Sequence, residues 1–127
     1  MLNIILFGSG GQLGAEFVSR MKKQHKLSIF NRSDCDITDY KKVRQSVLRI
    51  QPDIILNCTA YTNVDGAEKD FSNSNIVNNL ALENLSNVAN ESNSTLIHFS
   101  TDYVFNSTSI TPIKENHPKS PLNQYGL

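Results

Sequence analysis

The first fourteen residues constrain the fold most, because an apolar run meets a glycine-rich turn there. The run covers residues 2–7, and the turn that follows it has glycines at positions 8, 10, 11 and 14. A short apolar run that ends in glycines is typical of a buried parallel strand that turns into a helix. In the series Gly8, Gly11 and Gly14, the first glycine allows a tight turn, the second lets backbone N–H groups approach a pyrophosphate, and the third lets the helix pack closely on the strand. We therefore interpret residues 8–14 as a nucleotide-binding turn rather than a simple tight turn.

The rest of the chain alternates strand-like and helix-like patterns. Short apolar runs predict strands at residues 2–7, 27–30, 53–57 and 95–99. Helical spacing of apolar residues predicts helices at 12–24, between a cap at Thr38 or Asp39 and Pro52, and at 76–90, with a short turn or helix at 64–69. The first of these helices has an apolar face made of Leu13, Phe17, Val18 and Met21. Residues 100–127 are expected to be mostly loop, because prolines interrupt them.

Strands separated by helical crossovers predict an α/β fold. We expect a doubly wound, Rossmann-like parallel sheet with helices on both faces, forming one domain over residues 1–127 that stops after the fourth strand. In such a sheet the ligand crevice lies at the carboxyl ends of the strands.

Composition excludes several classes of partner. Twelve basic and twelve acidic residues cancel, so no charge excess indicates nucleic acid or a membrane surface. No apolar run approaches the roughly 20 residues of a membrane span, and the N-terminus does not resemble a signal peptide. Cys35 and Cys58 are expected to be reduced thiols, which suits a cytoplasmic protein, and no metal-ligand spacing is evident. His98 is expected to be a core histidine.

The residues after each predicted strand favour a dinucleotide. After the second strand comes Asn31-Arg32, where NAD-specific domains usually carry an acid for the ribose 2′-hydroxyl. An arginine there can accommodate a 2′-phosphate, so NADPH is favoured, while Asp34 and Asp36 keep NADH open. The small and hydroxylated residues at 57–62 would let a cofactor lie close to the third strand.

Motifs along the whole chain resemble one known family. They are Gly8-x-x-Gly11-x-x-Gly14, Asp36-Ile37-Thr38-Asp39, the strand 52–57, Ala60-Tyr61-Thr62-x-Val64-Asp65 with Ala67-Glu68, Ser100-Thr101-Asp102-Tyr103-Val104-Phe105 and Pro121-Leu122-Asn123-x-Tyr125-Gly126. In this order they resemble the dTDP-4-dehydrorhamnose reductases, a branch of the extended short-chain dehydrogenase/reductases. The resemblance implies reduction of the C4 ketone of a dTDP-6-deoxy-4-keto-hexose to dTDP-L-rhamnose with NADPH or NADH, in nucleotide-sugar and polysaccharide biosynthesis.

The same resemblance assigns roles to residues. Thr101 and Tyr125 would be catalytic, since a tyrosine phenol can protonate the alkoxide left by hydride transfer and a threonine hydroxyl can hold the carbonyl oxygen. Contact with the substrate is expected from Val64, Thr101, Asp102, Tyr103 and Tyr125. Contact with the cofactor is expected from Gly8, Ser9, Gly10, Gly11, Gln12, Leu13, Gly14, Asn31, Arg32, Asp36, Ile37, Cys58, Thr59, Ala60, Tyr61 and Thr62. Asn78 fits either a hydrogen bond near this site or an exposed helix position.

The chain departs from the family pattern at its end. The family's Tyr-x-x-x-Lys motif would begin at Tyr125, and its lysine would fall two positions beyond Leu127. The fourth strand would then be an edge with one face uncovered, which invites association. We expect the 127 residues alone to bind cofactor weakly and to show no measurable turnover, and we expect the full-length form to be able to form a homodimer.

Two other functions stay open. The first is a related nucleotide-sugar epimerase or dehydratase, although those enzymes keep NAD bound and commonly carry an acid where this chain has Asn31. The second is a non-catalytic module that binds a dinucleotide and regulates a partner.

Overall fold

A computed structural model describes residues 1–106 and 111–127 of the chain. The strands are β1 (Asn3–Phe7), β2 (Lys26–Phe30), β3 (Ile54–Asn57) and β4 (Thr95–His98). The helices are α1 (Gln12–Met21), α2 (Tyr40–Ile50), α3 (Val64–Lys69), α4 (Phe71–Asn75) and α5 (Ala81–Glu91), with a π-helical turn η1 (Ile76–Leu80) and a 3₁₀ turn η2 (Asp102–Val104). Within the described ranges, no helix combines the length and the apolar character needed to cross a bilayer.

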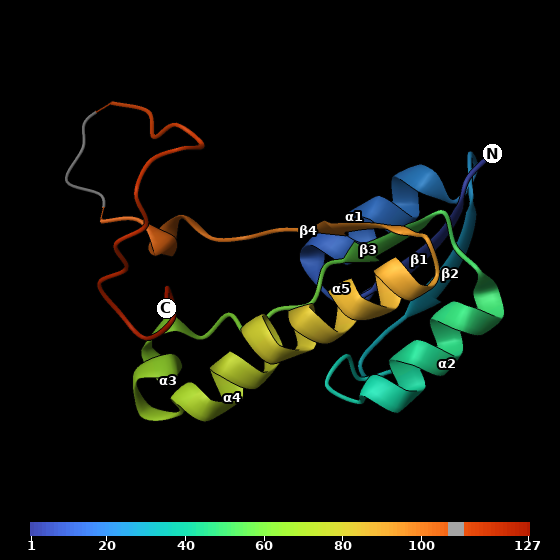
Figure 1. Ribbon diagram of the computed structural model, residues 1–127. Coiled ribbons are helices and arrows are strands. Elements are labelled where there is room, and N and C mark those ends of the chain that lie inside the picture. Colours follow the sequence, from blue (N-terminus) through green and yellow to red (C-terminus); the bar gives the residue numbers. More distant parts are fainter. Residues whose placement is uncertain (107–110) are drawn as a thin grey trace.

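The strands form a single parallel sheet in the order β2-β1-β3-β4 (Figure 1). Ile5 of β1 pairs with Ser28 of β2 on one side and with Ile55 of β3 on the other. The chain therefore builds outward from β1 in both directions, first to β2 and then through β3 to β4. This reversal between β1 and β3 is the topological switch point of a doubly wound sheet, and it confirms the predicted fold class.

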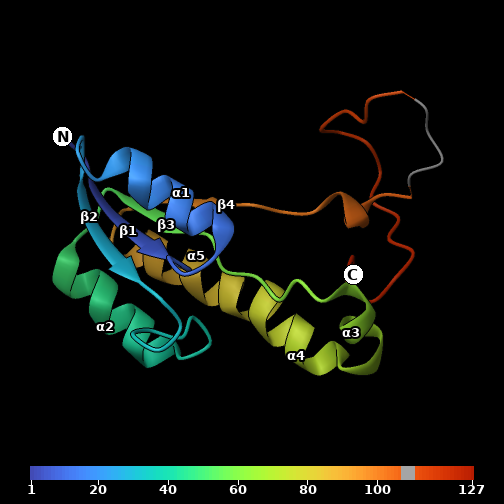
Figure 2. The ribbon, with the colours of Figure 1, turned by 180° about the vertical axis from the view of Figure 1, so that it is seen from behind.

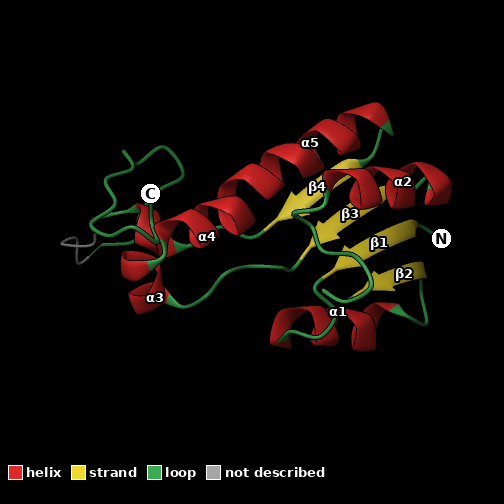
Figure 3. Cartoon of the chain, turned by 90° about the horizontal axis from the view of Figure 1, so that it is seen from below, coloured by secondary structure: helices red, strands yellow, loops and turns green. Residues whose placement is uncertain are grey.

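Each face of the sheet has its own apolar core because side chains alternate along β1. Ile5 and Phe7 point toward α2 and α5, where Val43, Val47 and Leu85 are fully buried with them. On the other face, Ile4, Leu6 and Leu56 pack against Phe17, Val18 and Met21 of α1. Figure 3 shows α2 and α5 on one side of the sheet and α1 on the other. The opposite view of the molecule in Figure 2 also shows α1 beside the sheet. Strands buried on both faces explain the unbroken apolar run in the sequence.

The glycine turn fixes how α1 leaves the sheet. Gly8 has a φ of +88°, and a Cβ atom there would lie 2.8 Å from the backbone carbonyl carbon of Cys58. A Cβ at Gly14 would overlap the backbone carbonyl oxygen of Gly8. Both positions need glycine, the first for its conformation and for the close approach of the loop after β3, the second so that α1 can pack on the turn.

The helices differ in places from the sequence prediction. The first helix ends at Met21, and Leu13 is 41% exposed, so Leu13 does not pack into the core with the rest of the apolar face of that helix. Leu13 lies in the first turn of α1, at the carboxyl edge of the sheet, and faces a cavity there instead. Asp39 caps α2 by accepting a hydrogen bond from the N–H of Lys42. The helix expected to begin at Ile76 is preceded by α4, which continues through η1 into α5.

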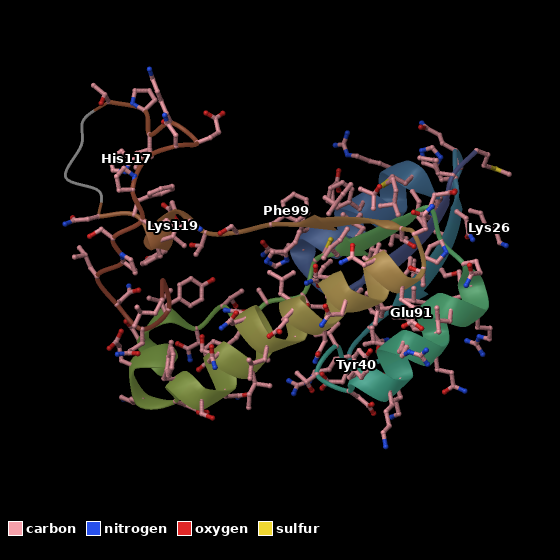
Figure 4. The ribbon with its side chains drawn as sticks, viewed as in Figure 1. Lys26, Tyr40, Glu91, Phe99, His117 and Lys119 are labelled. Carbon is pink, nitrogen blue, oxygen red and sulfur yellow. The ribbon has the colours of Figure 1, made fainter. Side chains whose placement is uncertain are left out.

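The sheet is incompletely covered over β4. Leu96 packs into the core on the α5 side, while Ile97 is 39% exposed on the opposite face. Phe99, which follows β4, is 44% exposed, and its ring centroid lies 5.8 Å from that of Phe17. Figure 4 shows Phe99 on the extended stretch that leaves the sheet. Within the described residues, β4 is therefore an edge strand with one apolar face open to solvent, as the sequence predicted.

A polar pair, buried Asn57 and half-buried His98, joins the carboxyl ends of β3 and β4. Asn57 is 1% exposed, and its Nδ2 lies 3.1 Å from Nδ1 of His98. The Asn57 amide oxygen accepts hydrogen bonds from the backbone N–H and the hydroxyl of Thr59, so its amide nitrogen is the group that donates to His98. His98 thus accepts at Nδ1, which requires a neutral imidazole. Burial also lowers the pKa of His98 below its ordinary value of 6.5.

We expect Gly14→Ala to destabilise the chain, although alanine favours helix by roughly 1 kcal/mol over glycine. The added Cβ overlaps the Gly8 carbonyl oxygen, so α1 must move, at an expected cost of about 1–3 kcal/mol. Gly10→Ala is the matched control, because a Cβ at Gly10 meets no atom within 4 Å. Urea unfolding should show a lower midpoint for Gly14→Ala alone, and equal midpoints for the two variants would contradict the packing described.

His98 should make stability depend on pH. Because its folded-state pKa is lowered, the unfolded chain binds the proton more readily, and the free energy of unfolding should be greatest above about pH 6.5 and fall as the pH drops below it. In His98→Gln this part of the pH dependence should be missing. Chemical unfolding of both proteins from pH 8 to pH 5 measures the difference, and parallel profiles would show that His98 is not held neutral.

Candidate functional site

Two cavities lie at the carboxyl ends of the strands and share a wall. The β4 cavity, about 770 Å³, lies between the start of α1, the ends of β3 and β4, and the C-terminal residues 124–127. The β2 cavity, about 440 Å³, lies between the glycine turn, the loop after β2 and the loop after β3. Gly11 and four residues of the β3 loop line both: Cys58, Thr59, Ala60 and Thr62. The two cavities therefore adjoin each other at the switch point of the sheet, and together we call them the crevice.

The glycine turn presents backbone donors to this crevice. Among the described residues, no side chain caps α1 at Gly11, whereas Asp39, Asn63 and Asp70 cap α2, α3 and α4. The first turn of α1 also contains no acidic residue. Its free N–H groups and the positive end of its dipole suit an anion. The open space beside Gly10 leaves room for such a group to approach the backbone.

The loop after β2 is organised by its own polar side chains. The Oδ1 atom of Asn31 accepts hydrogen bonds from the N–H and hydroxyl of Ser33 and from the N–H of Asp34. The Nε atom of Arg32 donates to Oδ2 of Asp36 at 2.9 Å. Asn31, Arg32 and Asp36 line the β2 cavity together with Cys35 and Ile37, while Asp34 is outside its lining.

The charge state of Asp36 follows from its contacts. Partial burial acts to raise the pKa of its carboxyl. The hydrogen bonds from the N–H and hydroxyl of Thr38 to Oδ1, and the Arg32 guanidinium at Oδ2, outweigh that effect and lower the pKa. Asp36 is therefore a carboxylate at neutral pH.

The loop after β3 is held by Asn78 of the π-helical turn η1. Asn78 accepts a hydrogen bond from the N–H of Tyr61 at 2.8 Å and donates one to the Tyr61 carbonyl at 3.0 Å. It is half-buried and also lines the β4 cavity, so of the two alternatives that the sequence left open, the hydrogen bond near this site holds and the exposed helix position does not. A turn with i→i+5 hydrogen bonds rotates the following residues relative to a regular α-helix, and such turns are frequent at functional sites.

Thr101 and Tyr125 line the same β4 cavity. Thr101 caps the short turn η2, because its hydroxyl oxygen accepts the N–H of Tyr103 at 3.2 Å. The ring of Tyr125 meets the ring of Tyr103 edge-on, with centroids 5.4 Å apart. On either side of Tyr125, the N–H of Gln124 donates to Glu68 of α3, and Gly126 packs so closely on the Tyr103 carbonyl that a Cβ would not fit. These contacts bring the two hydroxyl residues to one cavity from distant parts of the chain.

Most of the predicted cofactor and substrate residues lie on the crevice, and five do not. Ser9, Gly14, Val64, Asp102 and Tyr103 are outside the lining of both cavities. Gly14 is buried under the turn, and the ring of Tyr103 contacts the ring of Tyr125, which lines the β4 cavity. None of the proposed contacts with a cofactor or a substrate is tested by this geometry, and they stay predictions.

The structure adds wall residues that the sequence analysis did not assign to the site. Residues from the helix α4–η1 and from the end of β4 belong to this group: Phe71, Asn73, Asn75, Val77, Asn79, His98, Phe99 and Ser100. The abundance of asparagine between residues 73 and 79 was an available signal, but the helix pattern placed only residues after 75 in a helix.

The two cysteine thiols are not activated as nucleophiles in this arrangement. Cys35 and Cys58 are unpaired thiols, and burial raises the pKa of both. Over residues 1–106 and 111–127, no three His, Cys, Asp or Glu side chains gather in a way that could hold a metal ion.

Comparison with known proteins adds the family to this geometry. Residues 2–127 match the family described as RmlD substrate binding domain. The dTDP-4-dehydrorhamnose reductase of Salmonella typhimurium is 36% identical over 129 residues, which cover 98% of this chain and 43% of that protein. The dTDP-4-keto-6-deoxy-D-glucose reductase of Streptomyces niveus is 37% identical, over 96% of this chain and 43% of that protein.

A solved structure agrees with the fold. The crystal structure of dTDP-4-dehydrorhamnose reductase from Bacillus anthracis in complex with NADP superposes with a TM-score of 0.96 at 32% identity, over 99% of this chain and 46% of that one. The chain thus spans less than half the length of the relatives it matches. Because the family match covers nearly every residue, the chain belongs to the RmlD substrate binding domain family.

Proposed function

We propose that the protein containing this chain reduces the C4 ketone of a dTDP-6-deoxy-4-keto-hexose to dTDP-L-rhamnose, with NADPH as cofactor and NADH as the alternative. The observation that supports this most is that Thr101 and Tyr125 line one cavity, which shares Gly11 and part of the β3 loop with the cavity at the glycine turn. The names of the Salmonella typhimurium and Bacillus anthracis relatives support the same reaction.

The crevice has the features that a dinucleotide needs. The backbone N–H groups at the start of α1 would bind the pyrophosphate, and the loops after β2 and β3 would hold the adenosine half. Gly8 and Gly14 fit this assignment, because any side chain at either position would displace the turn. Gly10 and Gly11 leave the cavity side of the turn open. When bound, the reduced nicotinamide supplies the hydride for the ketone carbon.

Within the β4 cavity, the chain's own part in the reaction is proton transfer and orientation. Tyr125 would donate the proton of its Oη to the oxygen that becomes an alkoxide, and the Thr101 hydroxyl would hold that oxygen in line. The Tyr103 ring and the Gln124 and Gly126 contacts keep Tyr125 in place. We also predict that Val64, Asp102 and Tyr103 contact the sugar. A cytoplasmic location and a homodimer are further predictions.

The Streptomyces niveus relative favours a second candidate, since it is named for a different keto-sugar. The same Tyr125 and Thr101 roles would serve a dTDP-4-keto-6-deoxy-D-glucose, which differs from the first substrate in stereochemistry. Assaying both keto-sugars separates these candidates. Redox-neutral conversion with tightly held NAD would instead indicate an epimerase or dehydratase.

Cofactor binding can be tested at Gly10, where a side chain meets no protein atom. Gly10→Asp would place a carboxylate beside the proposed phosphate site and should weaken NADPH binding by roughly tenfold, because like charges repel. Gly10→Asn has nearly the same shape without the charge and should bind more tightly than Gly10→Asp. Fluorescence titration with NADPH and NADH measures this. Absence of saturable binding, or equal affinities of the two variants, would contradict the assignment of the turn.

The role of Tyr125 predicts a specific kinetic effect. In the protein containing this chain, Tyr125→Phe should keep the ring contact with Tyr103 but lower kcat by roughly 10²- to 10⁴-fold, since the proton donor is lost. NADPH affinity should be unchanged. Tyr40→Phe, on α2 away from both cavities, is the matched control and should keep full activity. A Tyr125→Phe protein with near-normal kcat would contradict the proposal.

A further inference from the structure

The loop after β2 contains a feature that the reaction itself does not need: an arginine whose orientation is set by a neighbouring acid. We propose that Asp36 is a positioning residue that holds the Arg32 guanidinium by its Nε edge and leaves the two terminal amino groups for the 2′-phosphate of NADPH. This inference rests on the proposed function, because it assigns the cofactor preference of the same crevice to one pair of side chains.

The geometry of the ion pair supports this division of the guanidinium. Arg32 donates through Nε to Oδ2 of Asp36 at 2.9 Å. A guanidinium offers five N–H donors in a rigid planar fork. Use of the Nε edge leaves the edge formed by Nη1 and Nη2, which can bind a phosphate with two parallel hydrogen bonds. Both residues line the β2 cavity, so the free edge belongs to a side chain at the wall of the crevice.

Within the part of the chain that the structure describes, the carboxylate of Asp36 is the one hydrogen-bond partner of the Arg32 side chain, so Arg32 depends on it as an anchor. Its side chain is 82% exposed, while that of Asp36 is 32% exposed. Asp36 is in turn fixed through its other oxygen, which accepts hydrogen bonds from the N–H of Thr38 at 2.9 Å and from its hydroxyl at 2.8 Å. An exposed arginine loses rotamer freedom when it binds a ligand, and a partner that fixes it beforehand reduces that loss. The contacts of Asp36 therefore prepare Arg32 for binding.

The same contacts leave the acids of this loop fewer free lone pairs for a ribose 2′-hydroxyl. Both oxygens of Asp36 already accept hydrogen bonds, from Arg32 on one side and Thr38 on the other. Asp34 accepts the N–H of Asn31 at 3.0 Å and lies outside the lining of the β2 cavity. NAD-specific domains use a free acid at this place. The loop thus favours a cofactor with a 2′-phosphate. From the sequence alone, Asp34 and Asp36 were also consistent with NADH.

The chain contains a matched control for this pair. On α1, Arg20 donates through Nε to Oε1 of Glu16 at 2.5 Å, again with the arginine four residues from the acid. Both of these residues are outside the lining of the two cavities. Substitution of Arg20 or Glu16 therefore removes an ion pair of the same kind without changing a residue that lines the crevice.

The test compares 2′,5′-ADP with 5′-AMP, which differ by the 2′-phosphate, in calorimetric titrations of the 127-residue chain. Asp36→Asn should weaken binding of 2′,5′-ADP by about 1.5-fold to fivefold more than binding of 5′-AMP, the range of an exposed ion pair. Arg32→Ala should remove the preference for 2′,5′-ADP, and adding Asp36→Asn to it should change the preference no further. Arg20→Ala and Glu16→Gln should leave the ratio of affinities unchanged.

The outcomes separate this inference from the proposed function. If Asp36→Asn weakens both ligands equally, or binds 2′,5′-ADP more tightly, Asp36 does not position Arg32 and the inference is overturned while the function stands. If the unaltered chain binds neither 2′,5′-ADP nor NADPH, the proposed function itself fails. Should Asp36→Asn not fold, Arg32→Lys gives the answer, since it keeps the charge but lacks the planar fork. Retention of the full 2′,5′-ADP preference in Arg32→Lys would overturn the inference.

Discussion

The contact between Gly14 and the carbonyl of Gly8 is the constraint on which the site depends. It lets α1 start directly at the end of β1, so the uncapped first turn of the helix lies at the switch point of the sheet. The positive φ of Gly8 and its close approach to Cys58 bring the loop after β3 against the same turn. These two loops form the wall common to both cavities. A side chain at either glycine would separate them.

The rest of the crevice is built by hydrogen bonds from side chains that the core does not use. Asn78 holds the β3 loop through the backbone of Tyr61, and Asn57 connects that loop to His98 at the end of β4. The segment around Tyr125 is held by Glu68 and Tyr103, both outside the sheet. The apolar layers thus fix where the strands end, and a separate polar network fixes the side chains beyond those ends.

The sequence predicted the sheet well and the site in part, for physical reasons. Buried strands and glycine turns have strong local signals, so the strand positions, their parallel arrangement and the role of Gly8 and Gly14 followed from periodicity and spacing. The early start of the helix at Phe71 was missed because a π-helical turn interrupts the apolar period there. The exposure of Leu13 depends on the cavity beside the first turn of α1, which the apolar period does not report. No local sequence pattern predicts that a C-terminal loop returns to the end of β4. The convergence of Thr101 and Tyr125 was therefore expected only from the family resemblance.

The most direct test of the account is NMR mapping of NADPH on the isotopically labelled 127-residue chain. If the crevice at the switch point holds the dinucleotide, the amide signals of residues 8–14, of the loop 58–62 and of Arg32 should shift together with a single dissociation constant. The amide signals of residues 22–25, which connect α1 to β2 on the opposite edge of the sheet, should not shift. Shifts confined to other surfaces, or none in residues 8–14 at saturation, would contradict the central claim.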